Sequence, residues 1–292
     1  MHALVLHNDK IKPASEPFLA AGQVGFLNGW GVFSTFRVRD GVLFAFERHW
    51  NRLVRDAKLL RVPMPDSADW LHQQLLKIAD ANGAHNSTLR LAIVRNKGGM
   101  FEGPGLTRPF ELIAFTADLR QWGESARLGV VQQGRHASSP FAGTKVTSWC
   151  QNLAWYERAH EQGYDEVVLL NERQEVSECT SANIFAVFGN QVVTPPLSSG
   201  CLPGITRELL LEVIKTDGLT VSERTLCLPD MEKADEVFIT SSTRELMSVA
   251  FIEGVKMKHP SSAKLKLQLE FTKFADDYVK LTTNAGSSSI IR

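Results

Sequence analysis

Residues 175–206, EVSECTSANIFAVFGNQVVTPPLSSGCLPGIT, contain the pattern from which the rest of the chain can be interpreted. Glu178 lies in a run of small polar residues. Two short apolar runs follow, and Gly189-Asn190 between them predicts a β-hairpin. The stretch ends at Gly204-Ile205-Thr206, where a helical repeat of apolar residues begins. An acid, a hairpin and a helix start this close together indicate a place that holds a charged, phosphorylated small molecule.

Upstream of that stretch, strand patterns alternate with helix patterns. Residues 32–46 form two β-rich runs joined by Asp40-Gly41, and the first run alternates so that Phe33, Thr35 and Arg37 share one face. Helices are expected at 50–60 and 67–81, and strands at 88–95 and 110–116. The first helix should turn Trp50, Leu53, Val54, Ala57 and Leu60 inward. This half of the chain is therefore predicted to be an α+β module.

Downstream, the pattern is again mixed. Strands are expected at 128–132, 166–170, 183–188, 191–194 and 236–240, and helices at 148–160, 205–215 and 261–281. The helix at 205–215 should bury Leu209, Leu210, Val213 and Ile214. Residues 117–125 lack periodicity. We therefore predict an α+β fold with domains at 1–117 and 128–281, a linker at 118–127 and a mobile tail at 282–292.

The composition excludes several classes of protein. The 292 residues are 43% hydrophobic and 22% charged, which suits folded domains with apolar cores. The 32 basic and 32 acidic residues cancel, so neither nucleic acid nor a membrane is indicated as a partner. The four cysteines are widely spaced, which indicates neither a zinc site nor a disulfide framework. A reducing cytoplasm is the expected compartment.

Three features could each bind an anion. At Gly204-Ile205-Thr206 the first N–H groups of a helix are unpaired, and the helix dipole favours negative charge there. The hydroxyls of residues 240–243 stand at the end of a predicted strand, and Arg52 lies on the helix at 50–60. Each feature also has a plainer explanation, namely an ordinary helix start, a polar turn and a solvated helix face.

Glu178 and Lys145 add acid–base chemistry. Glu178 could be an exposed loop carboxylate, or it could hold a proton on a pyridine nitrogen and so make the ring an electron sink. Lys145 could be an ordinary exposed lysine, or it could be partly desolvated near Trp149 and therefore more nucleophilic. A reactive amine, an acid for a pyridinium and several phosphate donors together describe pyridoxal-phosphate chemistry.

Several motifs, taken in order, resemble a known family. They are Lys145 before a helix, Val176-Ser177-Glu178, Ser181-Ala182-Asn183-Ile184-Phe185, Leu202-Pro203-Gly204-Ile205-Thr206-Arg207, and Ala234-Asp235-Glu236-Val237-Phe238 next to the hydroxyl cluster. This order resembles the class IV pyridoxal-phosphate aminotransferases, which include branched-chain and D-amino-acid aminotransferases and 4-amino-4-deoxychorismate lyases. The likeness covers about residues 22–255. It implies fold type IV, with two α+β domains and the cofactor at their interface, usually in a homodimer.

The resemblance also implies roles for individual residues. Lys145 would hold the cofactor covalently and carry a proton, and Glu178 would pair with the pyridine nitrogen. Arg52, within His49-Trp50-Asn51-Arg52-Leu53, matches the family's phosphate-binding arginine. The cofactor-binding candidates are Arg52, Lys145, Glu178, Asn183, Gly204, Ile205, Thr206, Ser241 and Ser242, with Lys145 as the catalytic residue.

The subfamily stays open at this stage. Branched-chain enzymes resemble Val-Phe-Glu-Gly-Ile-Arg where residues 32–37 read VFSTFR, and they commonly have a tyrosine in place of Cys150. Ser34-Thr35 and the RNKGG of residues 95–99 look more like the lyases, although Ser241 stands where the best-known lyases carry asparagine. The arginine and histidine loop of the D-amino-acid enzymes has no clean match at 96–105.

The expected reaction is amino transfer between an amino acid, either branched-chain-like or D, or an amine, and a 2-oxo acid. The alternative is release of pyruvate from 4-amino-4-deoxychorismate, and a remote one is a cofactor-binding homologue without activity. Either substrate bears a carboxylate that must be oriented over the ring. The substrate-binding candidates are Phe33, Thr35, Arg37, Arg90, Arg95, Lys97 and Thr243, although Arg37 and Arg90 could equally be exposed strand residues.

Overall fold

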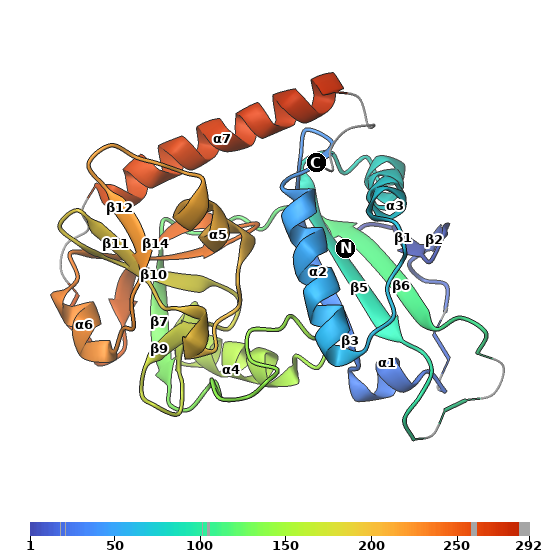
Figure 1. Cartoon of the computed structure of the whole chain (residues 1–292), viewed down its shortest axis with the longest axis horizontal. Coiled ribbons are helices and arrows are strands. Elements are labelled where there is room, and N and C mark those ends of the chain that lie inside the picture. The colour runs from blue at the N-terminus through green and yellow to red at the C-terminus, as the bar shows by residue number, and fades with distance from the viewer. Residues whose placement is uncertain (18, 21, 101, 104–105, 258–261, 286–292) are drawn as a thin grey trace. The chain divides into compact units, whose positions relative to one another are not determined.

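The computed structural model describes residues 1–292 except 18, 21, 101, 104–105, 258–261 and 286–292. The chain divides into two compact units. Unit 1 is Met1–Arg120, Lys145–Trp149 and Asp276–Arg292, and unit 2 is Gln121–Thr144 and Cys150–Ala275. Each unit combines a sheet with helices (Figure 1), so the predicted α+β class is confirmed.

Unit 1 contains an antiparallel sheet in the order β2-β1-β6-β5-β3-β4. Its strands are β1 (Leu4–His7), β2 (Lys10–Pro13), β3 (Gly31–Arg39), β4 (Val42–Leu43), β5 (Ser87–Arg95) and β6 (Phe110–Ala117). The predicted turn at Asp40-Gly41 is confirmed, with φ of 49° and 78°. The strand after it ends at Leu43 rather than 46, because Ala45 is left-handed (φ 53°) and a helix begins at Phe46.

Two helices cover one face of this sheet, α2 (Phe46–Leu60) and α3 (Ala68–Ala81) (Figure 1). Leu53 and Ala57 of α2 pack with the sheet in one apolar core, as their helical spacing predicts. Ser67 caps α3, since its hydroxyl accepts from the Trp70 N–H at 3.1 Å. Val54 is 38% exposed, so its predicted burial is wrong; the apolar arc of α2 is narrower than the spacing suggested.

Unit 2 contains a mixed sheet in the order β12-β11-β10-β13-β14-β7-β8-β9. Its strands are β7 (Ser125–Val131), β8 (Glu166–Leu170), β9 (Val176–Cys179), β10 (Asn183–Phe188), β11 (Gln191–Thr194), β12 (Thr220–Glu223), β13 (Glu236–Ser241) and β14 (Glu245–Ile252). The β10–β11 pairing confirms the hairpin predicted at Gly189-Asn190. The β7–β8, β7–β14 and β11–β12 pairs are parallel.

Helices pack on both faces of the sheet in unit 2. The helix α4 (Cys150–Glu161) places Ala159 against Val167 and Leu169 of β8. On the opposite face, Met231 of α6 (Leu228–Lys233) shares a core with Val168. This explains why every residue of β8 and β9 is buried. The remaining helical segments of unit 2 are η1 (Leu197–Ser199), α5 (Ile205–Glu212) and the first half of α7 (Ala263–Ala285).

Several sequence predictions require correction. The strand β7 begins at Ser125, inside the predicted linker, and α7 continues to Ala285, inside the predicted tail. Val213 is 38% exposed rather than buried, because α5 ends at Glu212. Elements that the sequence did not predict are α1 (Val24–Asn28), β9, β12, β14 and α6. The start of the helix predicted at 261 and the tail residues 286–292 lie outside the described residues.

None of the helices formed by the described residues combines the length and the apolar character that a bilayer-spanning segment requires.

Candidate active site

Lys145 is held against the edge of β3 in unit 1. Its carbonyl oxygen accepts from the Phe33 N–H at 3.0 Å, and Thr147 N–H donates to the Gly31 carbonyl at 3.0 Å. Its own N–H donates to the Asp56 carboxylate at 3.0 Å. The segment can pair here because β4 bonds only to the far end of β3. The sequence placed Lys145 in the second domain, whereas these bonds group residues 145–149 with unit 1.

The side chain of Lys145 lies over an aromatic ring. Its Nζ atom is 4.4 Å from the centre of the Phe33 ring. The Phe33 ring is itself edge-on to Trp149, with 5.9 Å between the ring centres. An aromatic face removes water from one side of the amine and attracts a cation. The lysine is therefore partly desolvated, as predicted from its neighbourhood in the sequence.

Arg52 is buried on α2, with 7% of its surface exposed. Its Nη2 donates to the Ser34 hydroxyl at 3.2 Å, and that hydroxyl is 2.7 Å from the Nδ1 atom of His49. The plainer explanation, a solvated helix face, is therefore wrong. Helical spacing hid this burial because an arginine among apolar residues looks like the polar side of the helix.

The surroundings of Arg52 are electropositive. Burial, together with the positive charges of Arg52 and Lys145, lowers the pKa of His49 well below its ordinary range. His49 is thus neutral at physiological pH, and its ring lies 4.3 Å from that of Phe36. A neutral imidazole and a hydroxyl can orient the guanidinium without cancelling its charge. This arrangement suits an anionic group.

Arg90 lies on the sheet face that also carries Phe33 and Thr35. Its guanidinium carbon is 4.0 Å from the centre of the Phe33 ring and 5.9 Å from that of Trp149. Thr35 is directly opposite it in the β3–β5 register. Burial lowers the pKa of Arg90, but an arginine remains charged at neutral pH. Among the described residues, no carboxylate forms an ion pair with it.

The other predicted substrate residues lie elsewhere or are engaged in other contacts. Arg37 donates to the Asn86 side chain at 3.4 Å and to the Val38 carbonyl. Arg95 donates to the carbonyls of Lys97, at 2.5 Å, and Arg61, and it stacks on Trp30. The side chain of Lys97 is exposed. These residues are not gathered around Lys145, and their assignment to substrate stays a prediction.

In unit 2, Glu178 is held from two sides on β9. One carboxylate oxygen accepts from Nε of Arg135 at 2.8 Å, and the other accepts from the Leu202 N–H at 3.0 Å. Arg135 also donates to the side chain of Asn152 at 3.3 Å. Glu178 is 7% exposed, so the explanation as an exposed loop carboxylate is wrong. Its partner Arg135 was missed, and no spacing could reveal it because 43 residues separate the two.

The start of α5 is shaped by Gly204 and Asn183. The Asn183 amide donates to the Leu202 carbonyl at 2.8 Å. A Cβ at position 204 would lie 2.0 Å from Oδ1 of Asn183, so only glycine fits there. Ile205 and Thr206 follow as buried first-turn residues, and their N–H groups have no acceptor among the described residues. These two donors remain available to an anion.

The hydroxyl cluster closes the β13–β14 turn. Thr240 pairs with Asn183 in the β10–β13 register, and its hydroxyl is buried without a partner among the described residues. Ser241 accepts from the Arg244 N–H at 3.2 Å, whereas Ser242 and Thr243 are partly exposed. A buried hydroxyl without a partner is costly, which indicates that Thr240 has a ligand when the protein is loaded.

Comparisons with known proteins point the same way. The family model described as "Amino-transferase class IV" matches residues 31–252. A D-alanine aminotransferase of Bacillus licheniformis is 28% identical over 256 residues, covering 86% of this chain and 88% of the relative. A branched-chain-amino-acid aminotransferase of Salmonella typhimurium is 28% identical over 246 residues, covering 78% of each. A hypothetical aminotransferase of Mycobacterium tuberculosis, solved in a PLP-bound form, has a TM-score of 0.81 at 24% identity, covering 94% of this chain and 100% of that one.

Proposed function

The chain belongs to the class IV aminotransferases, and we propose that it moves an amino group between an amino acid or amine and a 2-oxo acid. Its membership confirms the predicted family, the transaminase class of enzyme and pyridoxal 5′-phosphate as the cofactor. The relatives are named for D-alanine and for branched-chain amino acids. A branched-chain-like or D-amino acid is accordingly the donor that we propose.

The residues present fit this cofactor. A phosphate needs positive charge and N–H donors, and Arg52 and the first turn of α5 offer both. A pyridine nitrogen needs a buried carboxylate, and Glu178 offers one. Arg52 and Lys145 belong to unit 1, whereas Glu178, Ile205 and Thr206 belong to unit 2. The proposal requires that both sets act on one cofactor molecule.

When bound, pyridoxal phosphate supplies an aldehyde that condenses with amines and a ring that accepts electrons from the substrate Cα. Lys145 is the residue that we assign to covalent attachment. Once the incoming amine has displaced it, Lys145 carries the proton between the substrate Cα and the C4′ atom of the cofactor. Its fixed main chain keeps the amine within reach while its long side chain moves.

Glu178 keeps a proton on the pyridine nitrogen in this proposal. Arg135 and the Leu202 N–H orient the carboxylate and favour its ionised form. An ionised carboxylate next to the ring nitrogen stabilises the pyridinium and therefore the electron-poor ring. The observation that carries the proposed function is Lys145 held on β3 beside the buried Arg52, in a chain that matches the family over 31–252.

Arg90 is the candidate for the substrate carboxylate that the geometry favours. It is a cation, it stacks on the same Phe33 ring as Nζ of Lys145, and no carboxylate pairs with it among the described residues. A carboxylate bound there would lie close to the amine that carries the proton. Arg37, Arg95 and Lys97 each lack one of these properties or are engaged in other contacts.

Release of pyruvate from 4-amino-4-deoxychorismate remains the second candidate. Its support is Ser34-Thr35 in β3, which resembles the lyases and where Ser34 forms part of the Arg52 network. The two reactions need the same lysine and the same acid, so they differ only in the substrate that is accepted.

One experiment separates the candidates. The purified holoenzyme is mixed with a panel of L-amino acids, D-amino acids, (R)-amines and aminodeoxychorismate, and its visible absorbance and the pyruvate formed are followed. A transaminase loses the absorbance of the lysine-bound cofactor with an amino donor and regains it with a 2-oxo acid. Pyruvate formed stoichiometrically from aminodeoxychorismate would identify the lyase, and no response to any amine would refute both activities.

Two further parts of the proposal concern assembly and compartment. We propose a homodimer, as the family resemblance implies, with a gel-filtration and light-scattering mass of twice the chain as its test. The four free thiols suit a reducing compartment, and we propose the cytoplasm. Neither nucleic acid nor a membrane is part of this proposal, because the net charge is zero.

A further inference from the structure

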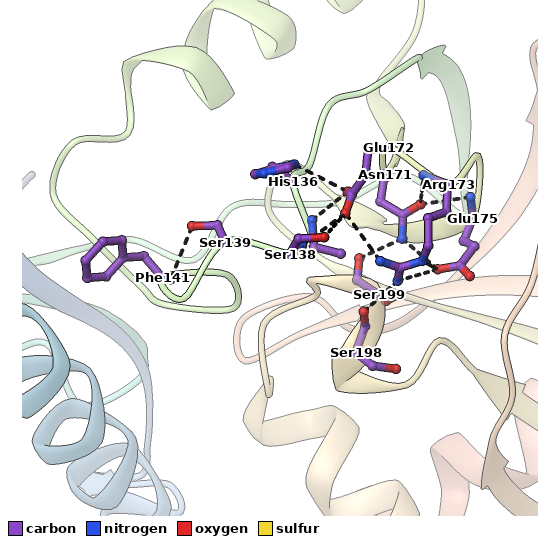
Figure 2. Close-up of polar contacts among 11 residues, drawn as sticks. His136, Ser138, Ser139, Phe141, Asn171, Glu172, Arg173, Glu175, Ser198 and Ser199 are labelled. Carbon is purple, nitrogen blue, oxygen red and sulfur yellow. Dashed lines mark hydrogen bonds and ion pairs between the residues drawn. The ribbon is translucent and has the colours of Figure 1, made fainter.

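A polar turn in unit 2 ties together the segments that hold Glu178. Residues 171–175 join β8 to β9 and contact two other loops, 134–144 and 195–204 (Figure 2). The turn is internally fixed. Asn171, fully buried, accepts from the N–H groups of Arg173 at 2.9 Å and Glu175 at 3.0 Å. It also donates to the Glu175 carboxylate at 2.7 Å.

Glu172 reaches from this turn to the first loop. Its carboxylate accepts from the N–H of Ala137 at 2.7 Å, the N–H of Ser138 at 3.0 Å and the Ser138 hydroxyl at 2.7 Å (Figure 2). These donors, the Ser138 hydroxyl first, lower the pKa of Glu172 to about 2. The positive or titratable groups nearest to it are Arg173, at 3.3 Å, and His136, at 3.7 Å. Glu172 is therefore ionised at neutral pH and binds the loop.

The second loop hangs from the same turn. Arg173 donates to the Ser198 carbonyl at 2.8 Å, and Asn171 donates to the Ser199 carbonyl at 3.2 Å. The two loops also touch each other, because a Cβ at Gly200 would lie 3.0 Å from Cα of Ala137. Any displacement of residue 137 would therefore be felt in both loops.

Both loops carry a partner of Glu178. The first begins with Arg135, which holds one carboxylate oxygen, and ends directly before Lys145. The second contains Leu202, whose N–H holds the other oxygen. We propose that Glu172 is a positioning residue for the transaminase: by fixing residues 137–138, it sets the approach of Arg135 to Glu178 and the course of the chain towards Lys145. Its effect on turnover rests on the proposed function.

The test compares Glu172→Ala and Glu172→Gln with the control Glu161→Gln, an exposed acid on α4. Hydrogen exchange of the holoenzyme is followed over residues 134–144. In the alanine variant the amides of Ala137 and Ser138 should exchange at least about tenfold faster, because their acceptor is gone. The kcat should fall about tenfold with KM within about twofold, since a small misplacement of reacting groups lowers the rate steeply. Glu172→Gln, which keeps one acceptor oxygen, should lie between.

Three outcomes would overturn the proposal. Unchanged exchange at 137 and 138 would show that Glu172 does not fix the loop. Faster exchange with a wild-type kcat would make the contact purely structural. The third is a loss of turnover that follows only a fall in the melting temperature and is equal in both Glu172 variants. Borohydride trapping of cofactor on Lys145 gives a readout independent of turnover; its absence in the wild type would overturn the proposed function as well, whereas the exchange result would still stand.

Discussion

Arg52 and Glu178 are buried to the same extent, 7% exposed each, yet the two units surround them differently. In unit 1, Arg52 donates to the neutral Ser34, which in turn contacts the neutral His49. In unit 2, Glu178 faces the full positive charge of Arg135. One charge is oriented by neutral groups, and the other is compensated by an opposite charge.

This difference matches the tasks that we propose for the two residues. A phosphate is bound through uncancelled positive charge, so neutral neighbours leave the attraction of Arg52 intact. A carboxylate that holds a proton on a ring nitrogen must stay ionised before the ring arrives, and a paired arginine stabilises that form. The comparison therefore predicts that changes in unit 1 affect cofactor affinity, whereas changes near Glu178 affect turnover.

The largest effect is expected at Lys145, which stands apart from both charge networks. Lys145→Ala should abolish covalent cofactor attachment and lower kcat by about 1,000-fold or more, because the proton carrier is lost. Borohydride reduction followed by mass spectrometry measures the attachment. Lys77→Ala, an exposed lysine on α3, is the control and should trap cofactor like the wild type. Normal stoichiometry of trapping in the Lys145 variant would remove the assignment.

The next effect is at Glu178. Glu178→Gln should lower kcat by about 100-fold while changing the dissociation constant of the cofactor by less than about fivefold, since an amide cannot stabilise the pyridinium charge. The measurements are steady-state kinetics and cofactor titration of the apo-protein. Glu161→Gln serves as the exposed control. An unimpaired kcat would refute the pyridinium role, and a loss confined to affinity would reverse the comparison.

A smaller effect is expected at Ser34, and it should fall on affinity. Ser34→Ala removes the hydroxyl between Arg52 and His49, so the guanidinium loses its orientation. The cofactor should bind about tenfold more weakly, corresponding to roughly 1.4 kcal/mol, within the range for a hydrogen bond to a charged group. Fluorescence titration of the apo-protein checks this, with Thr88→Ala on β5 as control. A fall in kcat at unchanged affinity would contradict the expectation.

The smallest effect concerns pH. His49 has a lowered pKa in the folded protein, so its contribution to stability is complete above the ordinary histidine value and is lost as pH falls. Below about pH 6.5 the free energy of unfolding should fall by up to about 1.4 kcal/mol per pH unit from this residue. Urea unfolding between pH 7.5 and 5 measures it. His49→Asn should flatten the slope, the exposed His85→Asn should not, and equal slopes in all three would contradict a neutral buried His49.

Much of the fold could be predicted from local patterns. The strand β8 has the predicted bounds, 166–170, and the tight turn at Asp40-Gly41 has the predicted left-handed conformation. Both depend on neighbours in the sequence, namely a short apolar run and a pair of residues that tolerate positive φ. Predictions failed where packing decided the outcome, as at Val54 and Val213, which belong to apolar arcs but remain exposed.

The candidate site was predicted as a set of residues but not as an arrangement. Lys145, Arg52 and Glu178 stood out through motifs, whereas Arg135 and Asp56 did not. The contact between Lys145 and Asp56 joins residues 89 apart, and that between Arg135 and Glu178 joins residues 43 apart. A charge pair between distant segments leaves no periodic trace in the sequence, so only the folded chain reveals it.

The sequence by itself determined the family, the cofactor and the alternation of strands and helices, because ordered motifs and apolar periods are local properties of a chain. The tertiary structure decided which charges are buried and what faces them: neutral groups around Arg52, a cation beside Glu178 and a three-donor contact at Glu172. The reason is physical, since desolvation and pairing depend on segments that meet only when the chain folds.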